Sequence, residues 1–143
     1  MARFYDLDEA NAAIPEVRTI LESLRDQRAE LIRLRDAVLA HATEDESRGE
    51  SRGDATTEAK IDADVRVLRL RMQGVIDRMQ AGVVRIDEMG ITLREIETGL
   101  IDFPALASGR QICLCWRLGE DHVAWWHELD DGFAGRRALA DLT

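Results

Sequence analysis

The fold of this chain is decided by residues 110–137, which read RQICLCWRLGEDHVAWWHELDDGFAGRR. All three tryptophans, both cysteines and two of the three histidines fall in this stretch. Side chains alternate in character on each side of Gly119, and a period of two is the pattern of β-strands whose two faces differ. The stretch therefore predicts a β-hairpin with one aromatic, apolar face.

The expected register of this hairpin follows from its turn. If Gly119 and Glu120 are the central residues of a two-residue type II′ turn, glycine takes the position that requires positive φ. The resulting pairs are Trp116 with Val123, Leu114 with Trp125 and Ile112 with His127. A four-residue loop at 119–122 keeps the same faces. Either turn places Cys113 and Cys115 on the face opposite to the aromatic one.

Amphipathic periodicity dominates the chain before this stretch. Apolar residues recur in steps of three and four over residues 14–38 and again over 61–86, which is the seam pattern of a coiled-coil-like helix pair. Pro15 either kinks the first helix or lies in the first turn of a new one. Gly90 supplies the C-terminal cap of the second helix. We expect a long antiparallel helical hairpin over about residues 7–89.

The segments on either side of the second helix differ from it in character. Residues 44–57 are rich in serine, glycine and acidic residues, as is typical of a flexible surface connector. Strand-like alternation begins at Ile91, and Gly99 turns the chain into a short second strand. Pro104 cannot donate to a strand ladder, so this strand should end there or lie at a sheet edge.

Length and composition place these elements in one domain. A chain of 143 residues is long enough for one sizeable core. We expect an α+β fold in which residues 1–143 form a single domain. Its parts are the helical hairpin, an antiparallel meander of three or four strands over 91–130, and a C-terminal tail at 131–143.

Charge and cysteine usage restrict the setting and the partners. The formal net charge of −9 argues against nucleic acid or an anionic membrane surface as a partner. No apolar run approaches the roughly 20 residues of a membrane span, and the first residues have no apolar signal core. Two cysteines at i and i+2 on one strand are poorly placed to bond each other, so they predict reduced thiols and a cytoplasmic protein.

The apolar stripes of the two helices are wider than a two-helix hairpin can bury by itself. Either the β part covers one end, or a second protomer completes a four-helix bundle. Arg28 and Arg35 occupy seam positions, where they suit a partner's carboxylate or extend to solvent. We expect a homodimer.

Carboxylates and one histidine supply the candidate site. His127, Asp130, Asp102 and Glu97 all fall in the β region, and Glu9 can reach it if the N-terminal turn docks there. Imidazole with carboxylate oxygens suits Mn, Fe or Zn, so a divalent metal is the cofactor such a site would take. The alternative is a histidine at the edge of the core whose ring is held by a carboxylate.

Two further groups of residues invite a binding role. Cys113, Cys115 and the nearby histidines have the ligand types of zinc, but structural zinc sites usually use C-x₂₋₄-C spacing. The expected register also places His127 on the other face from both cysteines. Arg117 and Arg136 are candidate anion contacts, the latter beside a glycine-containing turn. No complete catalytic motif is present.

Four segments carry a family resemblance. They are FYDLDEAN at 4–11, GLIDFPA at 99–105, LCWRLGE at 114–120 and WHELDDGFAGR at 126–136. In this order the chain resembles the domain-of-unknown-function family 2203 over nearly its whole length. The resemblance implies a small, stand-alone, cytosolic bacterial protein, and it implies no activity.

Two functions follow from these observations. The first is a cytosolic interaction or scaffold protein that self-associates through its helical hairpin. The second is a protein that binds a small molecule or a metal at the carboxylate–histidine site, with enzymatic activity left open. A pocket with convergent polar groups would favour the second function, and an exposed apolar stripe along the helices would favour the first.

Overall fold

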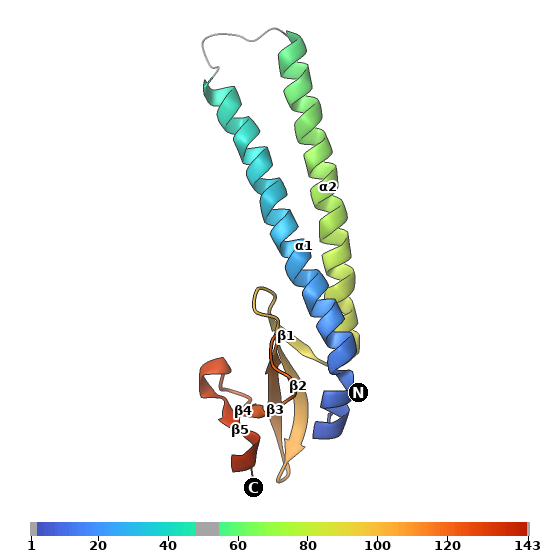
Figure 1. Cartoon of the computed structure of the whole chain (residues 1–143), viewed down its shortest axis with the longest axis vertical. Coiled ribbons are helices and arrows are strands. Elements are labelled where there is room, and N and C mark those ends of the chain that lie inside the picture. Colours follow the sequence, from blue (N-terminus) through green and yellow to red (C-terminus); the bar gives the residue numbers. More distant parts are fainter. Residues whose placement is uncertain (1–2, 48–54, 143) are drawn as a thin grey trace. The chain divides into compact units, whose positions relative to one another are not determined.

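The structure is a computed structural model that describes residues 3–47 and 55–142 (Figure 1). The chain divides into two compact units. The sheet unit combines residues 1–25 with 81–143, and the arm consists of residues 26–80. Within the described ranges, no helix is both long and apolar enough to cross a membrane.

Two long helices confirm the predicted helical hairpin. Helix α1 covers Leu7–Ser47 and α2 covers Ala55–Glu88. Asp6 and Glu9 cap α1 reciprocally: the Glu9 N–H donates to Asp6 Oδ1 at 2.7 Å, and the Asp6 N–H donates to Glu9 Oε1 at 3.2 Å. Pro15 lies inside α1, which continues on both sides of it.

The connector between the helices is shorter than the sequence predicts. α1 extends to Ser47 and α2 begins at Ala55, so the ends of the expected 44–57 segment are helical. Serine, glycine and acidic residues disfavour a helix only weakly, and a growing helix adds one hydrogen bond for each residue fixed. The centre of the expected connector, residues 48–54, lies outside the described residues.

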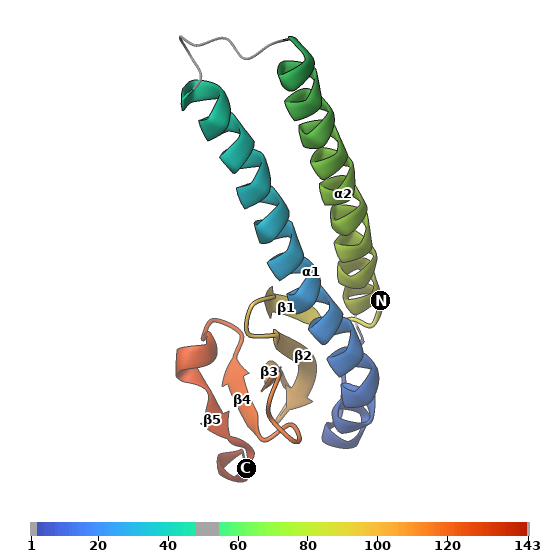
Figure 2. The same ribbon diagram turned by 45° about the horizontal axis from the view of Figure 1, so that its top comes forward.

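The β part is one antiparallel sheet in which each strand pairs with the next along the chain. Its strands are β1 (Thr92–Glu95), β2 (Leu100–Ala107), β3 (Arg110–Arg117), β4 (Trp125–Glu128) and β5 (Arg137–Ala138). The α+β class is confirmed, but the sheet has five strands where we expected three or four. Figure 2 shows β5 at the sheet edge beyond β4.

The additional strand comes from the segment that we expected to be a tail. β5 pairs with β4 through Trp125–Ala138 and Trp126–Arg137, and two short 3₁₀ helices surround it, η1 at Phe133–Gly135 and η2 at Leu139–Asp141. A two-residue strand is too short to show an alternating pattern, so its sequence carries no strand signal.

Pro104 does not end β2, which continues through it to Ala107. The reason is that β1 pairs with β2 only as far as Asp102, so no strand lies beside Pro104 on that side. The backbone N–H of Tyr5 donates to the Pro104 carbonyl there at 2.7 Å. Pro104 therefore lies in a part of β2 that has a neighbouring strand on one side only. Its missing N–H is on the other side, so no hydrogen bond between strands is lost.

The β3–β4 hairpin is confirmed, but our expected register was wrong by one residue. The observed pairs are Ile112–Glu128, Cys113–His127, Leu114–Trp126 and Cys115–Trp125. Residues 118–124 connect the two strands. Val123 does not pair with β3, because its backbone N–H donates a hydrogen bond to Asn11 Oδ1 of α1 at 2.8 Å. Directly opposed residues share a sheet face, so His127 lies on the same face as both cysteines.

The apolar face of the sheet lies against α1. The Arg18 guanidinium carbon of α1 is 5.9 Å from the centroid of the Trp116 ring. The side chains buried from both elements are Ile14, Val17, Leu21, Leu24, Ile101, Phe103, Ile112, Leu114, Trp116 and Trp126. This core fixes the sheet, and the opposite face of β2, β3 and β4 carries the polar residues.

Candidate functional site

Three polar side chains meet at the centre of the sheet face turned away from α1. Asp102 on β2, Cys115 on β3 and His127 on β4 are each exposed by 2% or less. One ligand atom from each residue lies within 4.8 Å of the other two. Strand pairing produces this meeting, because Asp102 is opposite Cys115 and His127 is opposite Cys113. We call Asp102, Cys115 and His127 the polar trio.

Small side chains on the middle strand make the contact possible. β2 and β4 flank β3, so their backbones are about 9–10 Å apart. Asp102 and His127 nevertheless meet, with His127 Nε2 2.8 Å from Asp102 Oδ1. The β3 residues on this face are Cys113 and Cys115, and a leucine at either place would occupy space that the bridging pair needs.

The hydrogen bonds around the trio orient each group. His127 Nδ1 lies 2.7 Å from the Glu128 carbonyl oxygen, and a carbonyl only accepts, so Nδ1 carries a hydrogen. His127 Nε2 is therefore the ring atom directed at Asp102. On the other side of that carboxylate, Arg94 Nε donates to Asp102 Oδ2 at 2.7 Å. One carboxylate oxygen is thus held by Arg94 and the other faces the imidazole.

The two thiols on this face are neutral at ordinary pH. Burial, followed by the neighbouring Asp102 carboxylate, raises the pKa of the Cys115 thiol to about 12. Burial and the same carboxylate also raise the pKa of Cys113. A thiol with so high a pKa is a poor nucleophile, so the trio does not support covalent cysteine catalysis. A metal cation that replaces the thiol proton reverses this preference.

The other nominated carboxylates do not join the trio. Glu9 is part of the α1 cap, and both Asp130 and Glu97 are exposed. Across residues 3–47 and 55–142, the trio is the one group of three histidine, cysteine or acidic side chains placed to share an ion. Of the residues nominated from sequence, the structure therefore brings together His127 and Asp102.

The two nominated anion contacts meet at the ring of Phe133. The guanidinium carbons of Arg117 and Arg136 lie 4.9 Å and 4.7 Å from its centroid, and Arg136 is also 4.9 Å from the Trp125 centroid. Arg136 Nη2 donates to both carboxylate oxygens of Glu120, at 3.0 Å and 2.8 Å. Glu120 thus already neutralises Arg136.

Backbone amides in the nearby turn are also occupied. The N–H of Gly135 donates to Gly132 O and the N–H of Arg136 donates to Phe133 O. These amides close η1, so they do not form the anion-binding loop that the glycine-containing sequence suggested.

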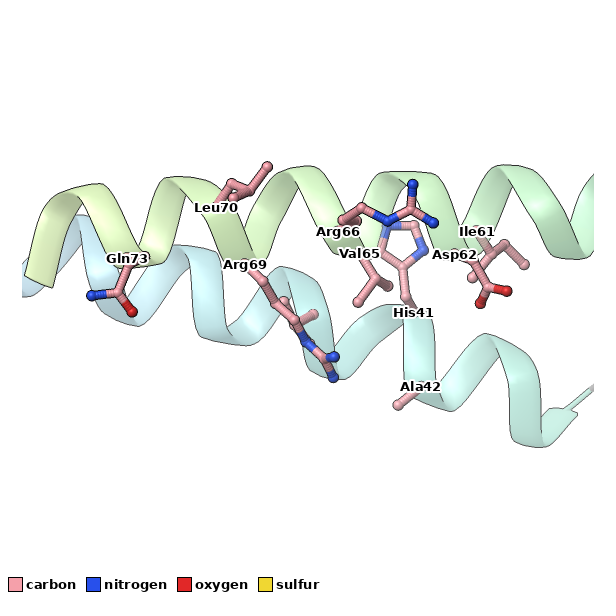
Figure 3. A pocket seen from close by; sticks show the side chains of 10 residues that line it. His41, Ala42, Ile61, Asp62, Val65, Arg66, Arg69, Leu70 and Gln73 are labelled. Atoms are coloured by element: carbon pink, nitrogen blue, oxygen red, sulfur yellow. The ribbon is translucent and has the colours of Figure 1, made fainter.

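Two open cavities lie among the described residues, one in each unit. The larger of the two is an open groove of about 700 Å³ in the arm, lined by residues of both helices that include Val38, Ile61 and Val65 (Figure 3). A cavity of about 380 Å³ in the sheet unit is lined by residues such as Arg25 and Arg117. Neither cavity is lined by a member of the trio.

Sequence reasoning missed two residues of this cluster, Cys115 and Arg94. Cys115 has a zinc-ligand type, but its C-x-C spacing is not that of structural zinc sites, and the expected register places it on the other sheet face from His127. Arg94 carried no signal of its own, since an arginine in a strand is usually solvated. The observed pairing of Thr92 with Asp102 would have indicated it, because the alternation of β1 then places Arg94 near that carboxylate.

Comparison with known proteins identifies the chain at the level of its family. A search of curated proteins and a search of solved structures each returned no match. A family model described as an uncharacterized conserved protein (DUF2203) matches residues 3–139. That match covers nearly all of the chain and confirms the resemblance drawn from its four segments. The chain belongs to the DUF2203 family.

Proposed function

We propose that this protein binds a divalent transition metal, with Zn²⁺ the best fit, through Asp102 Oδ1, Cys115 Sγ and His127 Nε2. The observation that carries the proposal is the meeting of these three ligand types within 4.8 Å at a buried position. Sulfur, imidazole nitrogen and carboxylate oxygen together are the donor set of zinc, whereas Mg²⁺ and Ca²⁺ take oxygen ligands.

The surroundings of the trio support a metal in a second way. A metal-binding histidine generally donates its other ring N–H to a carbonyl or carboxylate, which fixes the ring. His127 has this arrangement, with Nδ1 bonded to Glu128 O and Nε2 directed inward. The carboxylate is fixed similarly, by the bond from Arg94 to Asp102 Oδ2.

Binding requires only a small rearrangement. His127 Nε2 and Asp102 Oδ1 are 2.8 Å apart, whereas two ligand atoms of tetrahedral zinc lie about 3.3 Å apart when each bond is roughly 2 Å long. The ion takes the place of the proton shared between these two atoms and of the Cys115 thiol proton. Structural zinc sites have four protein ligands, whereas catalytic ones have three and keep an open fourth position. The trio supplies three ligands, so the number of ligands matches the open type of site.

A cytosolic setting is part of this proposal. Cys113 and Cys115 are both free and buried, which suits a reducing compartment where thiols remain available to metals.

Metal content measured by mass spectrometry tests the proposal. We expect protein purified without chelator or His-tag to carry near-stoichiometric zinc. His127→Ala and Cys115→Ser should lose it, because each removes one of three ligands. His122→Ala is the matched control, since His122 is exposed on the β3–β4 connection and its removal should leave the metal in place.

Cobalt provides a readout that does not depend on purification history. Co²⁺ added to chelator-treated wild type should produce a thiolate-to-cobalt charge-transfer band, and Cys115→Ser should lack it while keeping its circular dichroism spectrum. A wild type that is free of metal and also fails to produce this band would refute the proposal. The trio would then be a hydrogen-bonded link between β2, β3 and β4.

A further inference from the structure

One face of α2 in the arm is apolar and exposed except at Gly74, which is half-buried. Ala63, Val67, Leu70 and Gly74 follow one another in steps of four, three and four residues. Val67 is 48% exposed and Leu70 is 68% exposed. Figure 3 shows Leu70 pointing away from α1. We call these four residues the outer seam.

A different set of residues on α2 packs against α1. Ile61 and Val75 are buried, and Val65, Leu68 and Met72 between them are half-buried. This inner seam also has steps of three and four, but it lies on the opposite side of the helix from the outer seam. A helix that is apolar on two sides needs a neighbour on each side. Within the arm, α1 supplies one of these neighbours.

The spacing of the outer seam indicates what kind of neighbour covers it. Steps of three and four match the side-chain rows of another α-helix, into which each residue inserts as a knob into a hole. We propose that the outer seam packs against the outer seam of a second copy of this chain, with the two α2 helices antiparallel. This interface is independent of the proposed metal site.

Side-chain size fits this self-pairing. In an antiparallel pair, residues of the two alternating seam positions lie side by side. Centring the contact between Val67 and Leu70 places Val67 beside Leu70 of the second copy, and Ala63 beside Gly74 of the second copy. The two large residues thus form the middle of the contact and the small ones its ends. By two-fold symmetry every contact occurs twice.

The flanking charges select the antiparallel orientation. In a parallel pair, Arg66 would face Arg71 of the second copy, which places like charges together on both sides. In the antiparallel register described above, Asp64 faces Arg71 of the second copy, and Arg66 faces Gln73 of the second copy. All four residues are exposed, and Gln73 Nε2 already donates to Asp77 Oδ1 at 3.0 Å in its own helix. Self-pairing of Asp64 with Arg71 yields two opposite-charge contacts.

Sedimentation velocity over a dilution series tests the interface. We expect the wild type to pass from monomer to dimer as concentration rises, and Leu70→Glu to remain monomeric at every concentration. Leu106→Glu is the matched control, because Leu106 is similarly exposed at 61% but lies on β2 in the sheet unit. A wild type that is monomeric throughout, or a Leu70→Glu variant that still dimerises, would overturn the proposal.

Charge reversal tests the orientation. Arg71→Asp should weaken an antiparallel dimer by about tenfold, because it sets Asp64 against an acid twice. The double variant Asp64→Arg/Arg71→Asp should restore the wild-type affinity. A parallel dimer behaves oppositely, since Arg71→Asp would then attract Arg66 and strengthen it. A tighter dimer in Arg71→Asp would therefore rule out the antiparallel arrangement. A double variant that fails to restore the wild-type affinity would rule out the Asp64–Arg71 contact.

Discussion

The sheet unit and the arm are built from the same two helices, yet they bury side chains to different extents. In the sheet unit, the α1 seam residues Leu21 and Leu24 are completely buried. Farther along the same seam, in the arm, Leu31 is half-buried and Arg35 is exposed. The seam pattern is continuous across both units, so the pattern alone does not determine burial. The seam of α1 is completely buried only in the sheet unit, where the sheet covers it together with α2.

The largest expected contrast is between a core side chain of the sheet unit and an exposed side chain of the arm. Phe103→Ala in the sheet unit should cost about 3–5 kcal/mol of unfolding free energy, because it leaves a cavity in a close-packed core. Leu70→Ala in the arm, at a dilution that keeps the protein monomeric, should change it by less than about 0.5 kcal/mol. Urea unfolding followed by circular dichroism measures both, and equal costs would contradict the exposure of Leu70 in the monomer.

Ion pairs should show a smaller contrast of the same kind. Glu120→Ala removes the carboxylate from Arg136, whose side chain is 10% exposed, and should cost about 2 kcal/mol because a nearly buried cation loses its partner. Asp36→Ala in the arm removes the pair with Arg35, where both side chains are about 60% exposed. Its cost should stay below about 0.5 kcal/mol. Similar losses of unfolding free energy in the two variants would contradict the contrast.

The smallest expected effect depends on pH. The unfolded Cys115 thiol loses its proton near its ordinary pKa of 9, whereas the folded thiol keeps it to about 12. Between these values the folded state binds more protons, so stability falls as pH rises, by at most about 1.4 kcal/mol per pH unit. Cys115→Ala should flatten this decline in chelator-treated protein. Identical pH slopes in urea unfolding of the variant and the wild type would exclude Cys115 as its source.

Much of the fold could be predicted because its signals are local. The helices follow from apolar spacing, and the β3–β4 hairpin follows from alternation around Gly119. The register could not be predicted, because it depends on a contact between Val123 and Asn11, residues far apart in the sequence. β5 has only two residues, so its position depends on pairing with β4 and not on its own pattern.

The one-residue error in the β3–β4 register also explains which residues of the candidate site could be predicted from the sequence. His127 and Asp102 were nominated by residue type, which needs no register. Cys115 was excluded as a ligand by the expected register, although it lies beside them. Glu9, Glu97 and Asp130 were nominated because a surface carboxylate and a site carboxylate look alike in sequence. Only the strand pairing separates these two classes.

The sheet unit draws on both ends of the chain, and this has a consequence for its synthesis. A ribosome produces residues 3–25 first, but the strands that cover Val17 and Leu21 come after residue 91. These side chains therefore stay exposed to water until most of the chain has been translated. The arm, whose contacts are made between residues 26 and 80, can pair earlier.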